Sequence, residues 1–339
     1  RAPIGVVGAI VPWNFPQSLS AFKYAPALAA GCTLVIKPSP ETVLDSVLIA
    51  EAAAEAGIPG GVINFVPGGR EIGAYLVAHP GVDKISFTGS TAAGRMIAET
   101  CGRLLRPVTL ELGGKSAAIV LDDADLDLAT IGEKLFAATL LNNGQTCFLG
   151  TRVLAPRSRY AEVVDTFAAL ASSLKVGDAL DATTQIGPMA SVRQRDRVEG
   201  YIAKGKAEGA RVVVGGGRPS GQDKGWFVEP TIFADVDNNH TIAQEEIFGP
   251  VLSLIPYADL DDAVRIANDS DFGLGGSVWT RDHERGLGVA RRVQTGTIGV
   301  NTYAPDPTAP FGGVKASGLG RELGPEAIHH YQQVQSIYT

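Results

Sequence analysis

A cysteine, a glutamate and an asparagine provide the groups needed for covalent chemistry on a carbonyl carbon. Cys147 follows a short polar stretch, Glu111 ends an apolar run before two glycines, and Asn14 lies between two nearby prolines. A thiol can act as a nucleophile, a carboxylate as a general base, and a side-chain amide as a donor to an oxyanion. The other parts of the chain are expected to hold these side chains together and to bring a cofactor to them.

Each of these residues also has an ordinary interpretation. A lone cysteine is most often a small buried hydrophobe, but Cys147 follows small and polar residues at 144–146. A loop thiol near a helix N-terminus has a lowered pKa and can act as a thiolate. Glu111 can be a solvated carboxylate at a strand end, and Asn14 part of a simple turn. The two glycines after Glu111 predict instead that another segment or a ligand passes close to the backbone there.

Two weaker motifs lie elsewhere in the chain. Residues 89–94 join a strand to a helix through a glycine turn, which exposes helix N-terminal amides to phosphate. Their Gly-x4-Gly spacing is neither a P-loop nor the usual dinucleotide fingerprint. Residues 245–251, Glu-Glu-Ile-Phe-Gly-Pro-Val, read as a helix end that runs into a strand, and an exposed glutamate pair is ordinarily only surface.

The first third of the chain alternates β-branched runs with alanine-rich stretches of helical length, which predicts βαβ units and a parallel sheet. Ligands bind at the carboxyl ends of such strands. Unusual residues follow three of these runs, at 12–14, 37–39 and 88–90, which predicts a cofactor site. The expected strands are 4–11, 33–36, 62–65, 84–87 and 107–110, and the expected helices are 18–30, 42–56, 71–78 and 91–100.

A second alternation begins near Ser116 and continues to the C-terminal part of the chain. It predicts a second α/β region, with polar or glycine-rich loops between some of its elements. The expected strands are 116–120, 151–154, 251–257 and 296–300, with an edge strand at 334–338; the expected helices are 124–140, 159–174, 192–208, 260–268 and 282–293.

The length, net charge and cysteine count of the chain limit the class of protein. A length of 339 residues exceeds one ordinary core and favours two domains. A net charge of −7 argues against a nucleic-acid partner, which would need a basic face. No apolar run approaches the roughly 20 residues of a membrane span. Three cysteines without metal-ligand spacing predict a reducing, cytoplasmic compartment, no disulfide framework and no metal site.

Taken together, these residues resemble the aldehyde dehydrogenase superfamily over the whole chain. Any one motif can arise by chance, but seven occur in the family's order. They are Pro-Trp-Asn-Phe-Pro, Lys-Pro-Ser, Phe-Thr-Gly-Ser, Glu-Leu-Gly-Gly-Lys, Gly-Gln-Thr-Cys, Glu-Glu-Ile-Phe-Gly-Pro-Val and Pro-Phe-Gly-Gly-Val-Lys-x-Ser-Gly.

The resemblance implies an α/β architecture, with a Rossmann-like parallel-sheet cofactor domain and an α/β catalytic domain. The expected boundaries are 1–115 for an N-terminally incomplete cofactor domain, 116–310 for the catalytic domain, and 311–339 for a return segment with an oligomerisation strand. A homodimer or homotetramer is implied. Family chains carry a substantial portion before the position of Arg1.

The resemblance also implies roles for the central residues. Cys147 attacks an aldehyde to form a thiohemiacetal, whose oxyanion is held by the Asn14 amide and the Cys147 backbone N–H. Hydride transfer to NAD leaves a thioester, and Glu111 activates the water that hydrolyses it. Lys23 and Glu322 are expected to support water and proton movement.

Cofactor contacts are implied for residues in both halves of the chain. Lys37 is expected to reach the adenine ribose, Ser90 the pyrophosphate, and Glu246 the nicotinamide ribose, with Phe248 packed nearby. The full expected set is Ile10, Val11, Pro12, Trp13, Lys37, Ser39, Gly73, Phe87, Thr88, Gly89, Ser90, Gly94, Glu111, Leu112, Gly113, Gln194, Glu246 and Phe248.

Two departures from the family pattern bear on these roles. Many NAD-preferring members carry a glutamate three residues after the lysine, where this chain has Pro40 and then Glu41. Without that carboxylate a 2′-phosphate is repelled less, so NADP stays possible beside NAD. The interval from Glu111 to Cys147 is about two residues longer than in typical members, and the extra residues are expected around 131–141.

Aromatic and aliphatic side chains suggest an apolar or aromatic aldehyde as the small-molecule substrate. The residues expected to line its tunnel are Phe15, Leu19, Phe22, Phe148 and Tyr303. Three alternatives stay open: a CoA-acylating aldehyde dehydrogenase, a catalytically silent structural or binding protein, and a cofactor-free cysteine hydrolase. The last would need a histidine partner for Cys147, and none of the five histidines lies in a motif.

Overall fold

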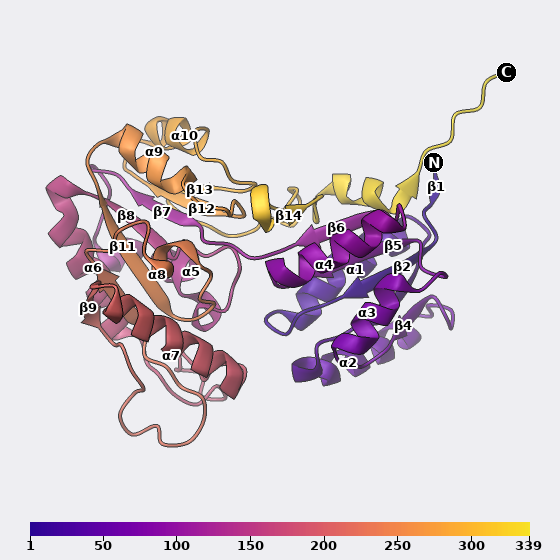
Figure 1. Cartoon of the computed structure of the whole chain (residues 1–339), viewed down its shortest axis with the longest axis horizontal. Coiled ribbons are helices and arrows are strands. Elements are labelled where there is room, and N and C mark those ends of the chain that lie inside the picture. Colours follow the sequence, from indigo (N-terminus) through magenta and orange to yellow (C-terminus); the bar gives the residue numbers. More distant parts are fainter. The chain divides into compact units, whose positions relative to one another are not determined.

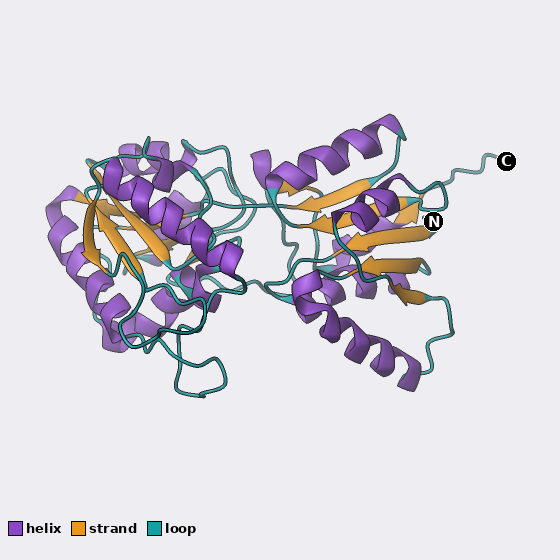
Figure 2. Cartoon of the chain, turned by 60° about the horizontal axis from the view of Figure 1, so that its bottom comes forward, coloured by secondary structure: helices purple, strands orange, loops and turns teal.

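The computed structural model describes all 339 residues and divides into two compact units. Unit 1 comprises residues 1–113 and 305–339, and unit 2 comprises residues 114–304. The indigo-to-purple beginning of the chain and its yellow end therefore belong to the same unit (Figure 1). Figure 2 shows that the strands of each unit have helices on both sides, so the expected α/β class is confirmed. No helix has the length and apolar character needed to span a membrane.

Unit 1 is built on a six-stranded sheet with the order β14-β6-β5-β2-β3-β4. All neighbours are parallel except β14 and β6. The chain runs outward from β2 through β3 to β4, and then returns to add β5 and β6 on the other side of β2. This reversal is a topological switch point, where open α/β sheets bind ligands. The strands are β2 Val6–Ile10, β3 Thr33–Lys37, β4 Ile63–Phe65, β5 Lys84–Thr88, β6 Val108–Glu111 and β14 Gly318–Leu319, with β1 Ala2–Pro3 and β15 Gln332–Gln333 forming a separate antiparallel pair.

The helices of unit 1 follow from capping and turn residues at their starts. Pro16 begins α1, where a missing N–H is harmless, and the Ser90 hydroxyl caps α4 by accepting the Ala93 N–H. The helices are α1 Pro16–Ala29, α2 Val43–Glu55, α3 Arg70–Ala78 and α4 Thr91–Arg103, and the short 3-10 turns are η1 Pro40–Thr42, η4 Lys315–Ser317 and η5 Pro325–Tyr331.

Strand β5 has two different faces, although both are buried. Ile85 and Phe87 belong to an apolar cluster that also contains Leu110 of β6. The alternate residues Lys84, Ser86 and Thr88 are polar and are also buried. Successive side chains of a strand point to opposite faces, so the centre of this sheet carries one apolar and one polar face.

Unit 2 is built on a seven-stranded sheet with the order β13-β12-β7-β8-β11-β10-β9, in which only β9 is antiparallel to its neighbour. Leu154 on one face and Val153 on the other belong to separate apolar clusters, as expected for a parallel sheet buried on both faces. The strands are β7 Ala117–Val120, β8 Arg152–Pro156, β9 Arg211–Val214, β10 Thr231–Ala234, β11 Val251–Tyr257, β12 Gly276–Trp279 and β13 Gly299–Val300.

The helices of unit 2 often begin at a side chain that accepts a backbone N–H. Asp127, Ser191, Asp259 and Asp282 cap α5, α7, α9 and α10 in this way. The helices are α5 Leu128–Thr139, α6 Tyr160–Ser173, α7 Val192–Ala207, α8 Thr241–Gln244, α9 Leu260–Asn268 and α10 His283–Ala290, and the 3-10 turns are η2 Leu141–Gly144 and η3 Arg157–Arg159.

Several predicted elements differ from the structure in their bounds: the strand expected at 296–300 is Gly299–Val300, and the helix expected at 282–293 is His283–Ala290. The helix expected from residue 124 begins at Leu128, because Asp127 terminates an extended acidic segment and caps the helix. The edge strand expected at 334–338 is wrong. The strand in this region is Gln332–Gln333, whose only partner strand is the two-residue β1. Strands β9, β10 and β12 were not predicted.

Candidate active site

The motifs at 12–14, 37–39 and 88–90 come together at the carboxyl edge of the unit 1 sheet. Strand β2 pairs in parallel with both β3 and β5, so these three strands end side by side. The segment from Val11 to Phe15 connects β2 to α1, Lys37 is the last residue of β3, and Gly89 and Ser90 connect β5 to α4. The switch point between β2 and β5 therefore coincides with the predicted cofactor residues.

The start of α4 has the form of an anion site. The helix spans 13 residues, and the N–H groups of its first turn carry the positive end of its dipole. A Cβ added to Gly89 would lie 2.5 Å from the Phe87 ring, and one added to Gly94 would lie 2.4 Å from Leu112. These two glycines therefore allow close packing of the turn on β5 and of α4 on the segment after β6.

Lys37 is held by backbone carbonyls and keeps donor capacity. Its ammonium donates to the carbonyl of Pro38 at 2.9 Å and to that of Gly68 at 2.8 Å, which leaves one of its three N–H bonds. Burial lowers the pKa of Lys37, while Glu41 acts to raise it. The Glu41 carboxylate also accepts a hydrogen bond from Ser39, so a carboxylate reaches this motif from one position later than in the family pattern.

Glu111 is a buried carboxyl at the end of β6, with 3% of its surface exposed. Neither of its oxygens has a hydrogen-bond partner. Burial, and then the charge of Glu322, raise the pKa of Glu111 well above its ordinary value, while Lys23 and Arg321 oppose the increase. A Cβ on Gly312 would lie 2.6 Å from Glu111 Oε1, so this glycine leaves room for the carboxyl. A carboxyl in such surroundings is suited to general-base chemistry.

Lys23 and Glu322 form a buried ion pair in the same unit. Lys23 Nζ lies 2.6 Å from Glu322 Oε1 and donates to Thr88 Oγ1 at 2.7 Å. Thr88 is the register partner of Glu111 between β5 and β6. The structure therefore brings the three predicted unit 1 residues Lys23, Glu111 and Glu322 into one electrostatic group.

The remaining predicted residues of unit 1 surround the β2–α1 connection. Asn14 and Phe15 are half-buried and immediately precede α1. Leu19, Phe22 and Lys23 share one face of the helix through their three- and four-residue spacing. Of the predicted cofactor residues, Ile10 and Val11 are buried, and Pro12 and Trp13 are half-buried. A Cβ added to Gly73 would lie 3.5 Å from the Lys37 side chain. The Gly113 carbonyl accepts the Ser317 hydroxyl at 2.7 Å.

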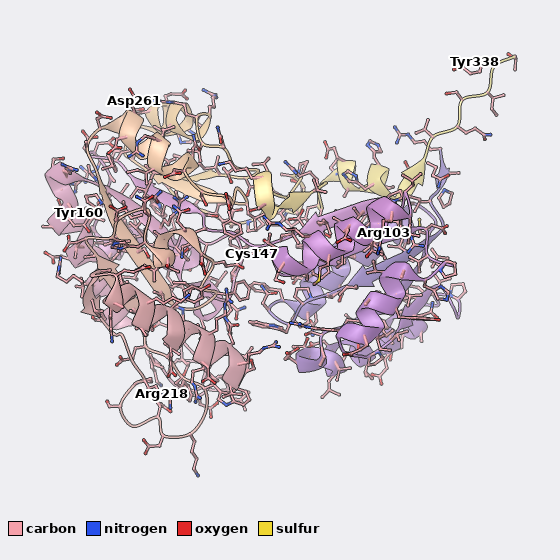
Figure 3. The ribbon with its side chains drawn as sticks, in the orientation of Figure 1. Arg103, Cys147, Tyr160, Arg218, Asp261 and Tyr338 are labelled. Atoms are coloured by element: carbon pink, nitrogen blue, oxygen red, sulfur yellow. The ribbon has the colours of Figure 1, made fainter.

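Cys147 of unit 2 lies in a loop outside any helix or strand (Figure 3). It follows α5 and η2, and the next α-helix along the chain begins at Tyr160. Asn142, Asn143 and Gly144 adopt φ values of 53°, 56° and 70°. Asparagine and glycine tolerate this left-handed region better than other residues, which explains why this lead-in reverses the chain tightly.

Side chains and close backbone contacts fix the loop that carries Cys147. Asn143 donates to the Pro188 carbonyl and accepts the Gly187 N–H, and Gln145 accepts the Ala190 N–H at 3.0 Å. A Cβ on Gly114 would lie 2.1 Å from the Cys147 carbonyl oxygen. The expectation that another segment passes close to the glycines after Glu111 is confirmed, and that segment is the cysteine loop.

A second loop of unit 2 presents the Glu246 carboxylate. Its Oε1 accepts the Gly114 N–H at 3.0 Å, and burial raises the pKa of Glu246. Gln194 Nε2 donates to the Phe248 carbonyl at 2.6 Å, and Phe248 has a φ of 62°. Gly114 thus contacts both the cysteine loop and this glutamate, and the predicted residues Gln194, Glu246 and Phe248 belong to one local structure.

Phe148 and Tyr303 form an aromatic pair next to the cysteine. Their ring centroids lie 4.9 Å apart, and Tyr303 OH lies 2.6 Å from Thr297 Oγ1. These are the two residues of unit 2 that were predicted to line the substrate tunnel, and the structure packs their rings against each other.

Sequence reasoning missed several buried polar residues. Lys84, Ser86 and Tyr331 surround the Lys23–Glu322 pair in unit 1, and Lys115 in unit 2 is 1% exposed, with no partner for its amine. Burial and the charge of Arg152 lower the pKa of Lys115 to about 7. The alternation Lys84, Ser86, Thr88 is a visible signal, but polar alternation ordinarily indicates a solvent-facing strand.

Comparison with known proteins identifies the family. The aldehyde dehydrogenase family model matches residues 1–337. Geranial dehydrogenase from Castellaniella defragrans is 65% identical over 338 residues, which are 100% of this chain and 70% of that protein. Betaine aldehyde dehydrogenase from Rhizobium etli is 46% identical over 341 residues, with 100% and 70% covered.

Solved structures agree with this match. An aldehyde dehydrogenase from Mycobacterium tuberculosis complexed with NAD+ has a TM-score of 0.95 and 55% identity, covering 98% of this chain and 68% of that one. A variant of aldehyde dehydrogenase C from Pseudomonas syringae, complexed with NAD+ and octanal, has a TM-score of 0.94 and 44% identity over the same shares. With the motif order, the fold of both units and these similarities in agreement, the chain belongs to the aldehyde dehydrogenase family.

Proposed function

We propose that this protein oxidises an apolar aldehyde to the carboxylic acid with NAD+, through a covalent intermediate on Cys147. The observation that carries the proposal is Glu111, a buried carboxyl with a raised pKa and no hydrogen-bond partner. A base of this kind is required to activate water for hydrolysis, and a structural carboxylate would be paired.

The reaction divides into two halves. The Cys147 thiolate adds to the aldehyde carbon, and the resulting oxyanion accepts hydrogen bonds from the Asn14 amide and the Cys147 N–H. The carbon then loses hydride, which NAD+ accepts when it is bound, and a thioester remains on Cys147. Glu111 takes a proton from water as the water attacks the thioester carbon. The C–S bond breaks, the acid leaves, the Cys147 thiolate is regenerated, and Glu111 gives up its proton to solvent.

The residues at the proposed cofactor site fit a dinucleotide. The N-terminus of α4 and the Gly89 turn suit a pyrophosphate, the remaining Lys37 N–H suits a ribose hydroxyl, and Glu246 offers a carboxylate to the second ribose. Glu41 beside Ser39 supplies a negative charge that disfavours a 2′-phosphate. This favours NAD+ over NADP+, and the two similar structures named above are both complexed with NAD+.

An apolar substrate is supported by two kinds of observation. Phe148 and Tyr303 provide aromatic surface beside the cysteine, and half-buried Leu19 and Phe22 provide apolar surface on α1. The geranial dehydrogenase that is 65% identical acts, by its name, on an unsaturated apolar aldehyde. We therefore propose medium-length, apolar aldehydes, with geranial and octanal as the first compounds to test.

The direct test is NADH formation with geranial, octanal, betaine aldehyde and acetaldehyde, for the wild type and for Cys147→Ala. Only the first two are expected to react efficiently, and the variant is expected to lose activity at least about 10⁴-fold. Cys101→Ala is the matched control, because it removes a buried thiol that belongs to α4 of unit 1. Equal activity of the wild type and Cys147→Ala would reject the mechanism.

Two further measurements separate the alternatives. Free acid as the product, with no acceleration by coenzyme A, is expected because Glu111 favours water over a thiol acceptor. An acyl-CoA product would favour the acylating alternative. A cofactor-free cysteine hydrolase would cleave esters through a histidine, whereas here ester hydrolysis is expected to be lost in Glu111→Gln and kept in each histidine variant. A protein that binds NAD+ but gives no product with any aldehyde would support a silent binding role.

A further inference from the structure

One face of helix α7 contacts the segment of unit 2 that presents Glu246. Gln194, Arg197 and Tyr201 share this face, because residues three and four positions apart lie together on a helix. The segment, residues 245–250, connects α8 to β11 and belongs to no helix or strand. Its carbonyl groups therefore depend on donors from other elements.

Gln194 and Arg197 supply such donors. Gln194 Nε2 donates to the Phe248 carbonyl at 2.6 Å and lies 3.5 Å from the Ile247 carbonyl oxygen. Arg197 Nε donates to the Ile247 carbonyl at 3.3 Å, and its Nη2 donates to the carbonyl of Glu246 itself. Two side chains of one helix thus bind three successive carbonyls, from residue 246 to residue 248.

Tyr201 orders the Arg197 side chain and binds the start of the segment. Tyr201 is buried, and the Arg197 guanidinium lies 5.0 Å from the centroid of its ring, which is a cation–π distance. Arg197 Nη2 also donates to the Tyr201 hydroxyl at 3.3 Å, and that hydroxyl donates to Glu245 Oε2 at 2.6 Å. Arg197 is exposed to solvent, but these contacts give its guanidinium a defined position.

The backbone that these donors bind is strained at Phe248. Its φ of 62° lies in the left-handed region, which is unfavourable for a bulky side chain. A strained conformation persists only where the surrounding structure imposes it. A Cβ added to Gly249 would lie 2.4 Å from the Val198 side chain, so α7 also packs closely against the residue that follows. The donors and the packing of α7 therefore act together to keep this backbone shape.

We propose that Arg197 is a positioning residue for NAD+ binding: together with Gln194 it fixes the backbone at 246–248 and so places the Glu246 carboxylate for the ribose. The inference rests on the proposed role of Glu246. One oxygen of this carboxylate, Oε1, accepts the Gly114 N–H at 3.0 Å. A carboxylate has two acceptor oxygens, so the other can accept a hydrogen bond from a ribose hydroxyl once the backbone is in place.

The cysteine loop is fixed by a different set of hydrogen bonds. Asn143 and Gln145 of that loop bind residues 187–190, whereas Arg197 binds residues 246–247 and Tyr201. Loss of the Arg197 side chain should therefore release the Glu246 backbone and leave the cysteine loop in place. The expected consequence is weaker NAD+ binding with an unchanged reactivity of Cys147 toward an ester.

The test measures the dissociation constant of NAD+ by isothermal titration calorimetry. In Arg197→Met the constant is expected to rise about fivefold or more, since two donors to the backbone are lost. Acylation of Cys147 by p-nitrophenyl octanoate without NAD+, followed by intact mass, should keep the wild-type rate, which also shows that the variant is folded. Arg195→Met is the matched control, because this arginine of the same helix pairs with Asp196 at 2.8 Å, and it should leave the constant unchanged.

A double-mutant cycle with Glu246→Ala shows whether Arg197 acts through Glu246. If it does, the double variant binds NAD+ as weakly as Glu246→Ala alone. Additive losses, an unchanged dissociation constant in Arg197→Met, or an equal loss of acylation rate would each reject the positioning role and leave the proposed function intact. If Glu246→Ala binds NAD+ as tightly as the wild type, the assignment of Glu246 to the ribose is itself wrong, and the inference fails with it.

Discussion

Lys84 in unit 1 and Arg152 in unit 2 are both fully buried cations, but their surroundings differ. Arg152 donates from all three nitrogens to the carbonyls of Lys115, Ile266 and Ala267 and to the Asn238 side chain, at 2.8–3.0 Å. Lys84 donates to one hydroxyl, and its other neighbours are the Glu322 carboxyl and an aromatic ring. One cation fastens backbone segments, whereas the other contributes mainly charge.

This contrast extends to the sheets that carry them. The central strands of unit 2 are apolar on both faces, and its predicted site residues lie in loops at 144–148 and 246–248. In unit 1 one face of β5 and β6 is itself polar and holds Glu111. A reactive carboxyl needs buried surroundings to raise its pKa, whereas a nucleophilic thiol needs access and correct placement. The two units therefore place their predicted site residues differently: unit 1 buries a carboxyl on a sheet face, and unit 2 holds a thiol in a loop.

The largest effect is expected at the polar face of unit 1. Glu111→Gln should slow hydrolysis of the acylated enzyme by about 10²–10⁴-fold, since the variant cannot accept a proton from water. Intact mass should show the acyl group persisting on Cys147. Glu162→Gln, which changes an exposed carboxylate of α6, is the control and should behave as the wild type.

Arg152→Met tests the structural cation of unit 2. It leaves the carbonyls of Lys115, Ile266 and Ala267 without their donor. Each buried carbonyl without a hydrogen-bond partner lowers the free energy of unfolding by about 1–3 kcal/mol. Unfolding in urea should show a loss of about 3 kcal/mol or more. Arg211→Met breaks only an exposed pair with Asp235 and should change stability by less than about 1 kcal/mol. Equal effects of the two substitutions would contradict the role assigned to Arg152.

Gly114→Ala tests whether placement of the loop decides the reactivity of Cys147. The added Cβ would lie 2.1 Å from the Cys147 carbonyl oxygen, so the loop must move, and a displacement of about 1 Å can lower a rate about a hundredfold. The rate of acylation is measured by the burst of p-nitrophenolate that is released when p-nitrophenyl octanoate acylates Cys147. Gly102→Ala, with no atom within 4 Å of its added Cβ, is the control and should keep the burst.

The smallest effect is expected from Lys84→Met on stability. Since the pKa of Lys84 falls from 10.5 to about 8 on folding, both the folded and unfolded states bind the proton below pH 8, and the burial penalty is present. Between about pH 8 and 10.5 only the unfolded state keeps the proton, so the wild type gains stability as the pH rises. Lys84→Met should be more stable than the wild type at pH 7, on the order of 1–2 kcal/mol. Urea unfolding at pH 7 and pH 9.5 should show this difference shrinking; a constant difference would mean that Lys84 stays charged.

Part of the site could be predicted because strand and helix patterns and glycine positions depend on neighbouring residues in the sequence. The alternation of β-branched and helical stretches predicted five strands of unit 1 in order, and their ends carry the residues 12–14, 37–39 and 88–90. The glycines after Glu111 correctly predicted a close approach, since the absence of a Cβ has few other uses at a strand end. The helix 260–268 and the strand 251–257 matched the structure, because their apolar patterns are long and regular.

The wrong or missing predictions concern residues whose contact partners are distant in the sequence. The strand expected at 334–338 had suitable residues, but its pairing ends with the two-residue β1. Lys84, Ser86 and Thr88 have the pattern of an exposed face, but Lys23 of α1 contacts Thr88, and the C-terminal segment with Glu322 and Tyr331 contacts Ser86. A period of two determines which residues share a face, but it does not determine whether that face meets water.

The sequence by itself therefore determined the α/β class, the order of the motifs, the identity of the nucleophile and base candidates, and the family. The tertiary structure decided that the cysteine loop passes over Gly114, that Arg152 serves backbone carbonyls, and that Lys84 lies in a buried layer with Glu322. The physical reason is that local propensity and side-chain chemistry belong to single residues, whereas burial, and with it the pKa of a carboxyl or an amine, is a property of everything packed around them.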